Sequence, residues 1–280
     1  MAEPSAQAPK TPKVSAVVVS HNRKDLLRCA LEALERAEAR ETIEVVVVDN
    51  GSIDGSQELE TEFPGARFIR IPRNFGLTKA LNVGVRGSEG EYVFFLHDDT
   101  EVYPDTTRLL AELLDARPEA AAVCPLLVDA EGRPAPQLGK FPPDDTWRPA
   151  DPGDEPMQVD YPRGAAFMMR RFLFTSIRQI DERYGQFGSD ADLCAQIRRA
   201  GKKILLHPQA RAHHTGHTAE STLRKADREL GISAWIFKYG GLVNGVRAKI
   251  GAAFGALGSL QLGVLRYLLA GQKVDGSQRE

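Results

Sequence analysis

The apolar residues of this chain fall into short continuous runs that alternate with segments of helical periodicity. Residues 14–20 and 43–48 are runs of β-branched and small apolar residues, each ending in polar residues. Between them, Leu27, Leu31 and Leu34 recur at helical spacing within residues 25–39. Strands this apolar are buried on both faces, as in a parallel sheet covered by helices. The pattern predicts an α/β fold with a parallel or mostly parallel central sheet.

The same alternation continues along the chain. It predicts strands over residues 68–71, 92–96, 121–128 and 203–206, and helices over residues 78–86, 106–116 and 191–200. Residues 141–162 are acidic and contain six prolines, so we expect a long functional loop or an arm over the site there.

Polar residues stand at the ends of three predicted strands. Ser20 and Asn22 end the first strand, Asp49 follows the second, and Asp98 and Asp99 follow the strand over residues 92–96. In open α/β sheets, ligands bind in the crevice outside the carboxyl ends of the strands. We therefore expect these side chains to face one site.

The acidic pair Asp98 and Asp99 suggests a metal ion. Carboxylates are hard ligands suited to Mg²⁺ or Mn²⁺, and such an ion can neutralise the charge of a departing nucleoside diphosphate. Two acids alone are better explained as a turn or a helix cap, so the surrounding sequence has to decide.

Five segments carry a family resemblance. They are residues 17–23 (VVVSHNR), 47–56 (VVDNGSIDGS), 74–77 (NFGL), 80–84 (ALNVG) and 95–102 (FLHDDTEV). From about residue 14 to about residue 218 the chain resembles glycosyltransferase family 2, the inverting group with the GT-A fold. By position, Asp99 matches the metal-binding acid of that family, whereas His97 stands where an Asp or Asn is usual.

The resemblance also implies a catalytic base. Residues 188–194 (GSDADLC) are similar to the family's Glu-Asp-x-Asp-Leu, with Ser189 in place of the first acid and Asp190 at the position of the base. Independently, an inverting transfer needs one carboxylate at the acceptor hydroxyl, and the dipole of a helix keeps an acid at its start ionised. Helix capping is the alternative role for Asp190 and Asp192.

Residues 210–216 (ARAHHTG) resemble the family's late histidine segment, where a histidine completes the metal shell. The alignment selects His214. Imidazole is a better ligand for Mn²⁺ than for Mg²⁺. A lone histidine is more often structural, but His213, His214 and His217 cluster after a predicted strand.

The resemblance assigns further residues to the nucleotide-sugar donor. Residues 159–166 (VDYPRGAA) resemble the segment that lines the sugar pocket, and the family's acid at the position of Asp49 contacts the base. The donor-binding residues expected on this basis are Ser20, Asn22, Arg23, Asp49, Asn74, Lys79, Asp98 and Gly164, and the expected metal ligands are Asp99, His214 and Asp98.

Taken together, these motifs imply an in-line displacement at the anomeric carbon, with Asp190 accepting the proton of the acceptor hydroxyl. Among family members, the chain is most similar to rhamnosyltransferase-like enzymes of surface polysaccharide assembly. This suggests dTDP-rhamnose as the donor, then a UDP-hexose, and a glycan or a lipid-linked acceptor. The departures at His97 and Ser189 leave a catalytically impaired nucleotide-sugar-binding or scaffold protein as the alternative.

Composition excludes several other classes. A formal charge of −2 and a pI of about 6.3 argue against a nucleic-acid partner. The chain has no Walker sequence, no dinucleotide fingerprint and no Gly-rich loop after its first strand, which argues against ATPases, dehydrogenases and sugar nucleotidyltransferases. The spacing of Cys29, Cys124 and Cys194 is typical of reduced thiols in a cytoplasmic enzyme.

The two ends differ from the middle. Residues 1–13 have no apolar segment of the signal-peptide kind and are expected to form a disordered tail before a catalytic domain over residues 14–220. We expect residues 221–280 to form a helical extension. From Arg224 to Lys273 there are eight basic residues and two acids.

The uncharged stretch over residues 250–265 is shorter than the ~20 residues of a bilayer span. Its basic flanks favour helices that lie at the inner face of the cell membrane. The alternative is a hairpin packed on the catalytic domain or on a second subunit of a homo-oligomer.

Overall fold

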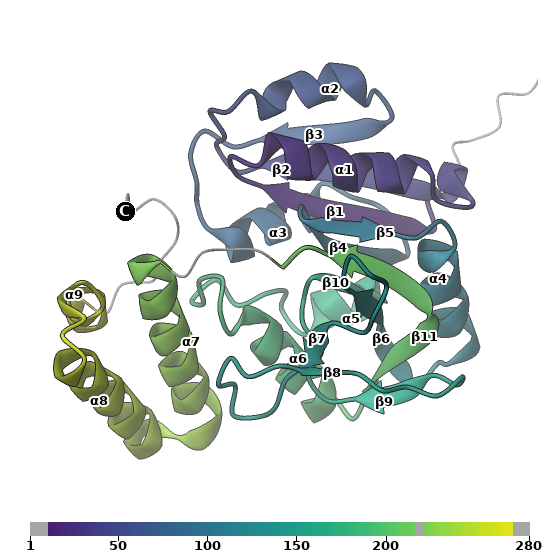
Figure 1. The fold of residues 1–280 in the computed structure, drawn as a ribbon. Coiled ribbons are helices and arrows are strands. Elements are labelled where there is room, and N and C mark those ends of the chain that lie inside the picture. Colours follow the sequence, from purple (N-terminus) through teal and green to yellow (C-terminus); the bar gives the residue numbers. More distant parts are fainter. Residues whose placement is uncertain (1–10, 217–220, 271–280) are drawn as a thin grey trace, which may run out of the picture.

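A nine-stranded sheet forms the centre of the computed structural model, which describes residues 11–216 and 221–270 (Figure 1). The strand order is β3-β2-β1-β4-β10-β6-β11-β5, and β9 pairs with β11. The strands are β1 (Val14–Ser20), β2 (Ile43–Asp49), β3 (Ala66–Arg70), β4 (Tyr92–His97), β5 (Thr100–Val102), β6 (Ala120–Val128), β9 (Met157–Val159), β10 (Ala166–Arg170) and β11 (Lys203–His214).

The strands β1 to β4, β6 and β11 run in one direction, because β10 is antiparallel to both β4 and β6. β5 and β9 are antiparallel to β11. The predicted α/β fold with a mostly parallel sheet is therefore confirmed. A second, two-stranded sheet pairs β7 (Pro136–Leu138) with β8 (Arg148–Pro149).

Helices cover both faces of the large sheet, so alternate residues of β1 enter two different cores. Val18 packs in the core that contains Leu27 and Leu31, and Val17 packs in the core that contains Ala80 and Phe174. The helices and helical turns of this part of the chain are α1 (Lys24–Glu35), η1 (Arg40–Thr42), η2 (Ser56–Glu58), α2 (Leu59–Glu62), α3 (Leu77–Arg86), α4 (Thr106–Ala116), α5 (Arg171–Ser176) and α6 (Ser189–Arg199).

The strand β11 is longer than predicted. The sequence predicts a strand over residues 203–206, whereas β11 continues to His214. A register shift between His207 and Arg211 lets its second half pair with the end of β6 and with β5 on the other side. The second half of β11 has polar residues that did not predict a strand, and pairing on both sides keeps it in the sheet. The proline-rich segment over residues 141–162 likewise contains β8 and β9.

The predicted helical extension is present as α7 (Thr222–Gly240), α8 (Leu242–Gly258) and α9 (Leu262–Ala270). α7 is anchored to α6, because the hydroxyl of Tyr239 donates to Asp192 at 2.8 Å and the Lys238 ammonium lies 2.7 Å from the same carboxylate. α8 and α9 pack against α7 (Figure 1). Among the described helices, none is long and apolar enough to cross a membrane.

Most of the predicted N-terminal tail lies outside the described residues, as do His217 and Lys273. Its last residue, Lys13, forms ion pairs with Glu91 at 2.7 Å and Asp115 at 3.0 Å.

Candidate active site

A cavity of about 1010 Å³ lies at the carboxyl ends of β1 and β4. Its wall brings together most of the residues that the sequence singled out. The predicted site residues that line it are Ser20, Asn22, Arg23, Asn74, Asp98, Asp99, Gly164, Asp190 and His214. Asp49 and Lys79 do not line it, although Asn50, the neighbour of Asp49, does.

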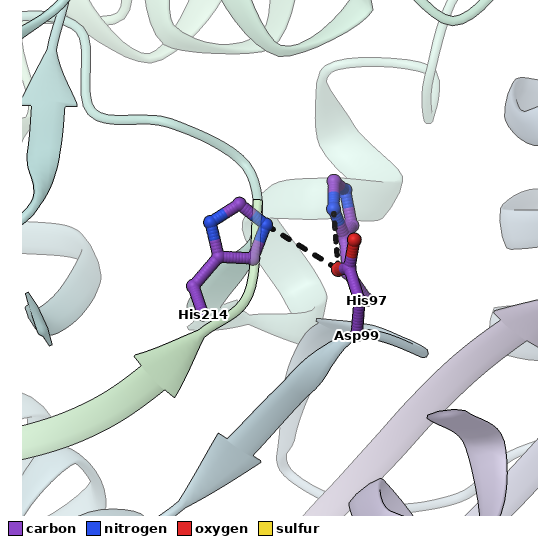
Figure 2. Close-up of side chains that lie close together, drawn as sticks. All are labelled: His97, Asp99 and His214. Carbon is purple, nitrogen blue, oxygen red and sulfur yellow. Dashed lines mark ion pairs between the residues drawn. The ribbon is translucent and has the colours of Figure 1, made fainter. Parts of the chain in front are cut away.

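His97, Asp99 and His214 form a cluster in this cavity (Figure 2). His97 ends β4, and the pairing of His214 with Thr100 brings the end of β11 beside Asp99. Oδ1 of Asp99 lies 3.3 Å from Nε2 of His214 and 3.8 Å from Nδ1 of His97. All three potential ligand atoms lie within 4.8 Å of one another.

Sequence reasoning left the role of His97 unassigned. β4 ends at His97, and the turn at Asp98 and Asp99 brings the His97 ring beside the Asp99 carboxylate, which the spacing along the chain did not predict. The other member of the cluster, His214, lies far along the chain, so only the pairing of β11 with β5 brings it into place.

The donor set fits a divalent transition metal. Oδ1 of Asp99 is buried and faces the two imidazoles, while Oδ2 lies 3.2 Å from the Arg23 guanidinium. Burial lowers the pKa of His97 to about 4, so at neutral pH its ring is uncharged and has a free lone pair. One carboxylate and two imidazoles suit Mn²⁺ better than Mg²⁺.

Asp99 remains an anion in this setting. Burial raises its pKa, but the His214 imidazole and the Arg23 guanidinium outweigh burial and hold the pKa of Asp99 below its usual range. The carboxylate is therefore ready to bind a cation at neutral pH.

Asp98 is oriented differently from Asp99. Its Oδ1 lies 3.2 Å from the Arg23 guanidinium, and it is not part of the cluster of His97, Asp99 and His214. Burial raises the pKa of Asp98 to about 6, although Arg23 opposes this effect. Asp98 lines the cavity and pairs with Arg23, and its expected roles as a metal ligand and a donor-binding residue stay predictions.

Asp190 stands in the first turn of α6, with its carboxylate at the wall of the cavity. Its Oδ1 accepts hydrogen bonds from the Tyr161 hydroxyl at 3.0 Å and from the backbone N–H of Ala191 at 2.8 Å. Burial raises the pKa of Asp190, and these two donors act against it. A Cβ at Gly164 would lie 3.2 Å from the Cβ of Asp190, so a glycine there leaves room for the acid.

The nearby acid Asp192 has a different position. Its side chain is fully buried and accepts hydrogen bonds from the hydroxyls of Tyr239 and Tyr184, at 2.8 Å and 3.3 Å. Asp192 does not line the cavity and instead joins α6 to α7.

The loops on the donor side are tied together by amides. Asn22 adopts a positive φ of 54°, which asparagine tolerates, and its Oδ1 accepts from the N–H of Ile53 at 2.8 Å. The amide of Asn50 donates to Oδ1 of Asn74 at 2.9 Å, and Asp49 accepts from the N–H of Ser52 at 2.9 Å. These residues therefore shape the loops after β1, β2 and β3.

Two predicted donor residues make few polar contacts there. The hydroxyl of Ser20 is buried at the end of β1, close to Asp98. The Lys79 ammonium lies 4.5 Å from the ring centroid of Phe75.

Arg163 belongs to the segment over residues 159–166 that the family resemblance assigns to the sugar pocket, but it was not among the predicted site residues. Its guanidinium lies 4.6 Å from the ring centroid of Trp147, and its Nε is buried with no hydrogen-bond partner within the described chain. Burial lowers the pKa of Arg163, against the attraction of Asp145 and Asp190. The stacking of Arg163 on Trp147 could not be predicted, because the aromatic ring comes from the proline-rich segment.

A family model, described as glycosyl transferase family 2, matches residues 15–178. The chain belongs to this family. The resemblance deduced from the motifs around Ser20, Asp49 and Asp99 is thereby confirmed, and transferase chemistry is the activity of the family.

Two curated relatives are similar to most of this chain. The chain is 27% identical over 247 residues to an N-acetylglucosaminyl-diphospho-decaprenol L-rhamnosyltransferase of Mycobacterium tuberculosis, covering 76% of this chain and 79% of the relative. It is 30% identical over 236 residues to the O-antigen biosynthesis protein RfbC of Myxococcus xanthus, covering 78% of this chain but 18% of that protein.

Solved structures support the GT-A fold. GalNAc-T7 with UDP, GalNAc and Mn²⁺ is similar with a TM-score of 0.66 at 18% identity, over 82% of this chain and 48% of that one. The mannosyltransferase PcManGT from Pyrobaculum calidifontis, in complex with GDP-Man and Mn²⁺, gives a TM-score of 0.60 at 16% identity, over 96% of this chain and 77% of that one.

Proposed function

We propose that this chain is an inverting, metal-dependent glycosyltransferase that moves a sugar from a nucleotide-diphosphate sugar to an acceptor hydroxyl. One observation carries the proposal: a single cavity contains both the cluster of His97, Asp99 and His214 and the carboxylate of Asp190. Leaving-group stabilisation and proton removal, the two demands of an in-line displacement, can then be met side by side.

His97, Asp99 and His214 would hold the metal, and a bound divalent cation would supply charge neutralisation of the departing diphosphate. The Arg23 guanidinium, 3.2 Å from both Asp98 and Asp99, limits repulsion between the two neighbouring acids. Asp190 accepts the proton of the acceptor hydroxyl, and Tyr161 orients the carboxylate of Asp190. The remaining donor-binding roles fall to Ser20, Asn22, Asn74, Gly164 and, through loop shape, Asp49.

The donor we propose is dTDP-rhamnose, with a UDP-hexose second, and the acceptor is a lipid-linked glycan of surface polysaccharide synthesis. The names of the relatives support this assignment, since one is a rhamnosyltransferase that acts on a diphospho-decaprenol and another is an O-antigen biosynthesis protein. A lipid-linked acceptor would be met at the membrane surface, so the site of action we propose is the cytoplasmic face of the membrane.

The catalytic unit in this proposal includes α7. The carboxylate of Asp227 accepts from the backbone N–H groups of Gln186 and Phe187, at 3.0 Å and 2.7 Å, just before the turn that leads to Asp190. Leu223 and Arg228 of the same helix line the cavity. The boundary expected at residue 220 would then lie after α7.

The test is a panel of nucleotide sugars supplied with Mn²⁺ or Mg²⁺ and scored by release of nucleoside diphosphate. The wild-type chain should release diphosphate from one donor, and Asp190→Asn should lower the rate by about 10² to 10⁴ while donor binding persists. Donor binding without turnover in the wild type would instead support the scaffold alternative. An Asp190→Asn variant with full activity would refute Asp190 as the base.

A further inference from the structure

Exposed large apolar side chains gather on the last two helices. On α8, the exposed fractions of Val243, Ile250 and Phe254 are 65%, 50% and 68%. Elsewhere in the described chain, Ile53, Tyr103 and Phe172 are the exposed large apolar residues. The set on α8, α9 and their flanks is Leu242, Val243, Val246, Ile250, Phe254, Leu257, Leu260, Leu262 and Leu269.

The packing of α8 on the rest of the protein uses its small residues. Gly245 and Ala256 are the buried positions of this helix, and Ala252 is partly buried between them. A Cβ at Gly245 would lie 2.3 Å from the Phe237 ring, so the two helices approach closely there. Residues 243, 250, 254 and 257 recur at helical spacing on another side of the helix, which leaves their large side chains in solvent.

The charged residues of α8 and α9 have one sign. Residues 232–274 contain no Asp or Glu, while Arg247, Lys249 and Arg266 lie on α8 and α9. A helix that presents large apolar side chains together with cations and lacks acids suits the headgroup region of an anionic bilayer.

We propose that this surface, defined by Val243, Ile250, Phe254 and Leu257 with Arg247, docks on an anionic lipid bilayer, with α8 parallel to the membrane plane. This surface would provide the membrane contact of the proposed function. The use of the contact rests on that function, but the binding to lipid does not. α7 links the surface to the cavity: α8 packs on α7, and Arg228 of α7 lines the cavity and lies 3.4 Å from Asp145. Docking would thus hold the cavity close to a lipid-linked acceptor.

The test is co-sedimentation of the full chain with vesicles of phosphatidylcholine alone or of phosphatidylcholine with phosphatidylglycerol. The wild type should bind the anionic vesicles and lose binding at high salt. The double variant Ile250→Ser, Phe254→Ser should weaken binding about tenfold or more, because it removes apolar area that enters the interface. The triple variant Arg247→Gln, Lys249→Gln, Arg266→Gln should weaken binding to anionic vesicles and abolish its salt dependence.

The matched control is Phe172→Ser, because Phe172 is 62% exposed and belongs to α5 instead of α8 or α9. It should bind vesicles as the wild type does. Equal binding by the Ile250→Ser, Phe254→Ser variant would overturn the proposal. So would a wild type that ignores vesicles and forms a dimer in sedimentation velocity that this variant breaks, since a second copy would then cover the surface.

Donor turnover by the same preparations separates the two proposals. Vesicle binding without release of nucleoside diphosphate contradicts the proposed activity alone. Turnover without vesicle binding contradicts the lipid-docking surface alone.

Discussion

The hydroxyl of Tyr161 donates a 3.0 Å hydrogen bond to Oδ1 of Asp190. Tyr161 is itself held by aromatic neighbours: its ring stacks on Phe141 with centroids 5.3 Å apart, and Phe141 stacks on Trp235 of α7 at 5.4 Å. The candidate base is therefore positioned by the proline-rich segment and, through Phe141, by a helix that follows the family-matched region.

Removing this hydroxyl should shift the pH profile. Burial raises the pKa of Asp190 and the Tyr161 hydroxyl lowers it, so Tyr161→Phe should raise it further. A base acts only when deprotonated, so activity is present above this pKa and is lost as the pH falls through it. A lost hydrogen bond of about 1 kcal/mol corresponds to a shift of about one unit at most. The acid limb of kcat/KM should move to higher pH, and an unmoved limb would contradict the positioning role of Tyr161.

The two histidines of the metal cluster should differ from His213, the neighbour of His214, in their effect on metal binding. His97→Ala and His214→Ala should each raise the Kd for Mn²⁺ by about tenfold or more, since losing even an outer partner of a ligand costs this much. His213→Ala is the matched control, because His213 pairs with Glu101 at 3.5 Å and is not in the cluster. Calorimetric titration with Mn²⁺ measures all three. Wild-type affinity in His97→Ala would remove His97 from the ligand set.

Chelation offers a second check on the same cluster. A chelator should abolish nucleoside diphosphate release by the wild type, and added Mn²⁺ should restore it. Full activity in the chelator would contradict metal dependence.

Arg163 should bind an anionic group of the substrates. Its guanidinium lines the cavity, and Nε lacks a hydrogen-bond partner within the described chain, so a phosphate oxygen could take that place. Hydrogen bonds to charged groups contribute about 1.5–3 kcal/mol, so Arg163→Gln should weaken binding of the nucleoside diphosphate about 10-fold to 100-fold. Arg117→Gln, an exposed position outside the cavity, is the control. Unchanged affinity in Arg163→Gln would contradict this role.

Asp192 should matter for stability and not for chemistry. Its buried carboxylate accepts from Tyr239 and Tyr184 and pairs with Lys238, which keeps a second partner in Asp181. Asp192→Ala leaves these donors without their acceptor and should lower the free energy of unfolding by about 1–3 kcal/mol in denaturant titrations. Asp192→Asn keeps an acceptor and should cost less. Equal stability of Asp192→Ala and wild type would show that the contact between α6 and α7 contributes nothing.

The sequence by itself determined the central strands and their polar ends. The strand over residues 14–20 and the helix over residues 106–116 have the predicted bounds, because a short β-branched run with polar ends favours a buried strand and a strong helical period favours a helix. The local motifs also selected Asp99, Asp190 and His214, and the structure brings all three to one cavity.

Only the tertiary structure decided which side chains contact one another around that cavity. The pairing of β11 with β5 carries His214 to Asp99, and side-chain direction turns His97 toward Asp99 while Asp98 pairs with Arg23. Arg163 is placed by its contact with Trp147, and Asp190 is held by Tyr161. These relationships depend on turns and on strand pairings between residues distant in sequence, and the periodicity of one segment does not record which distant residues meet.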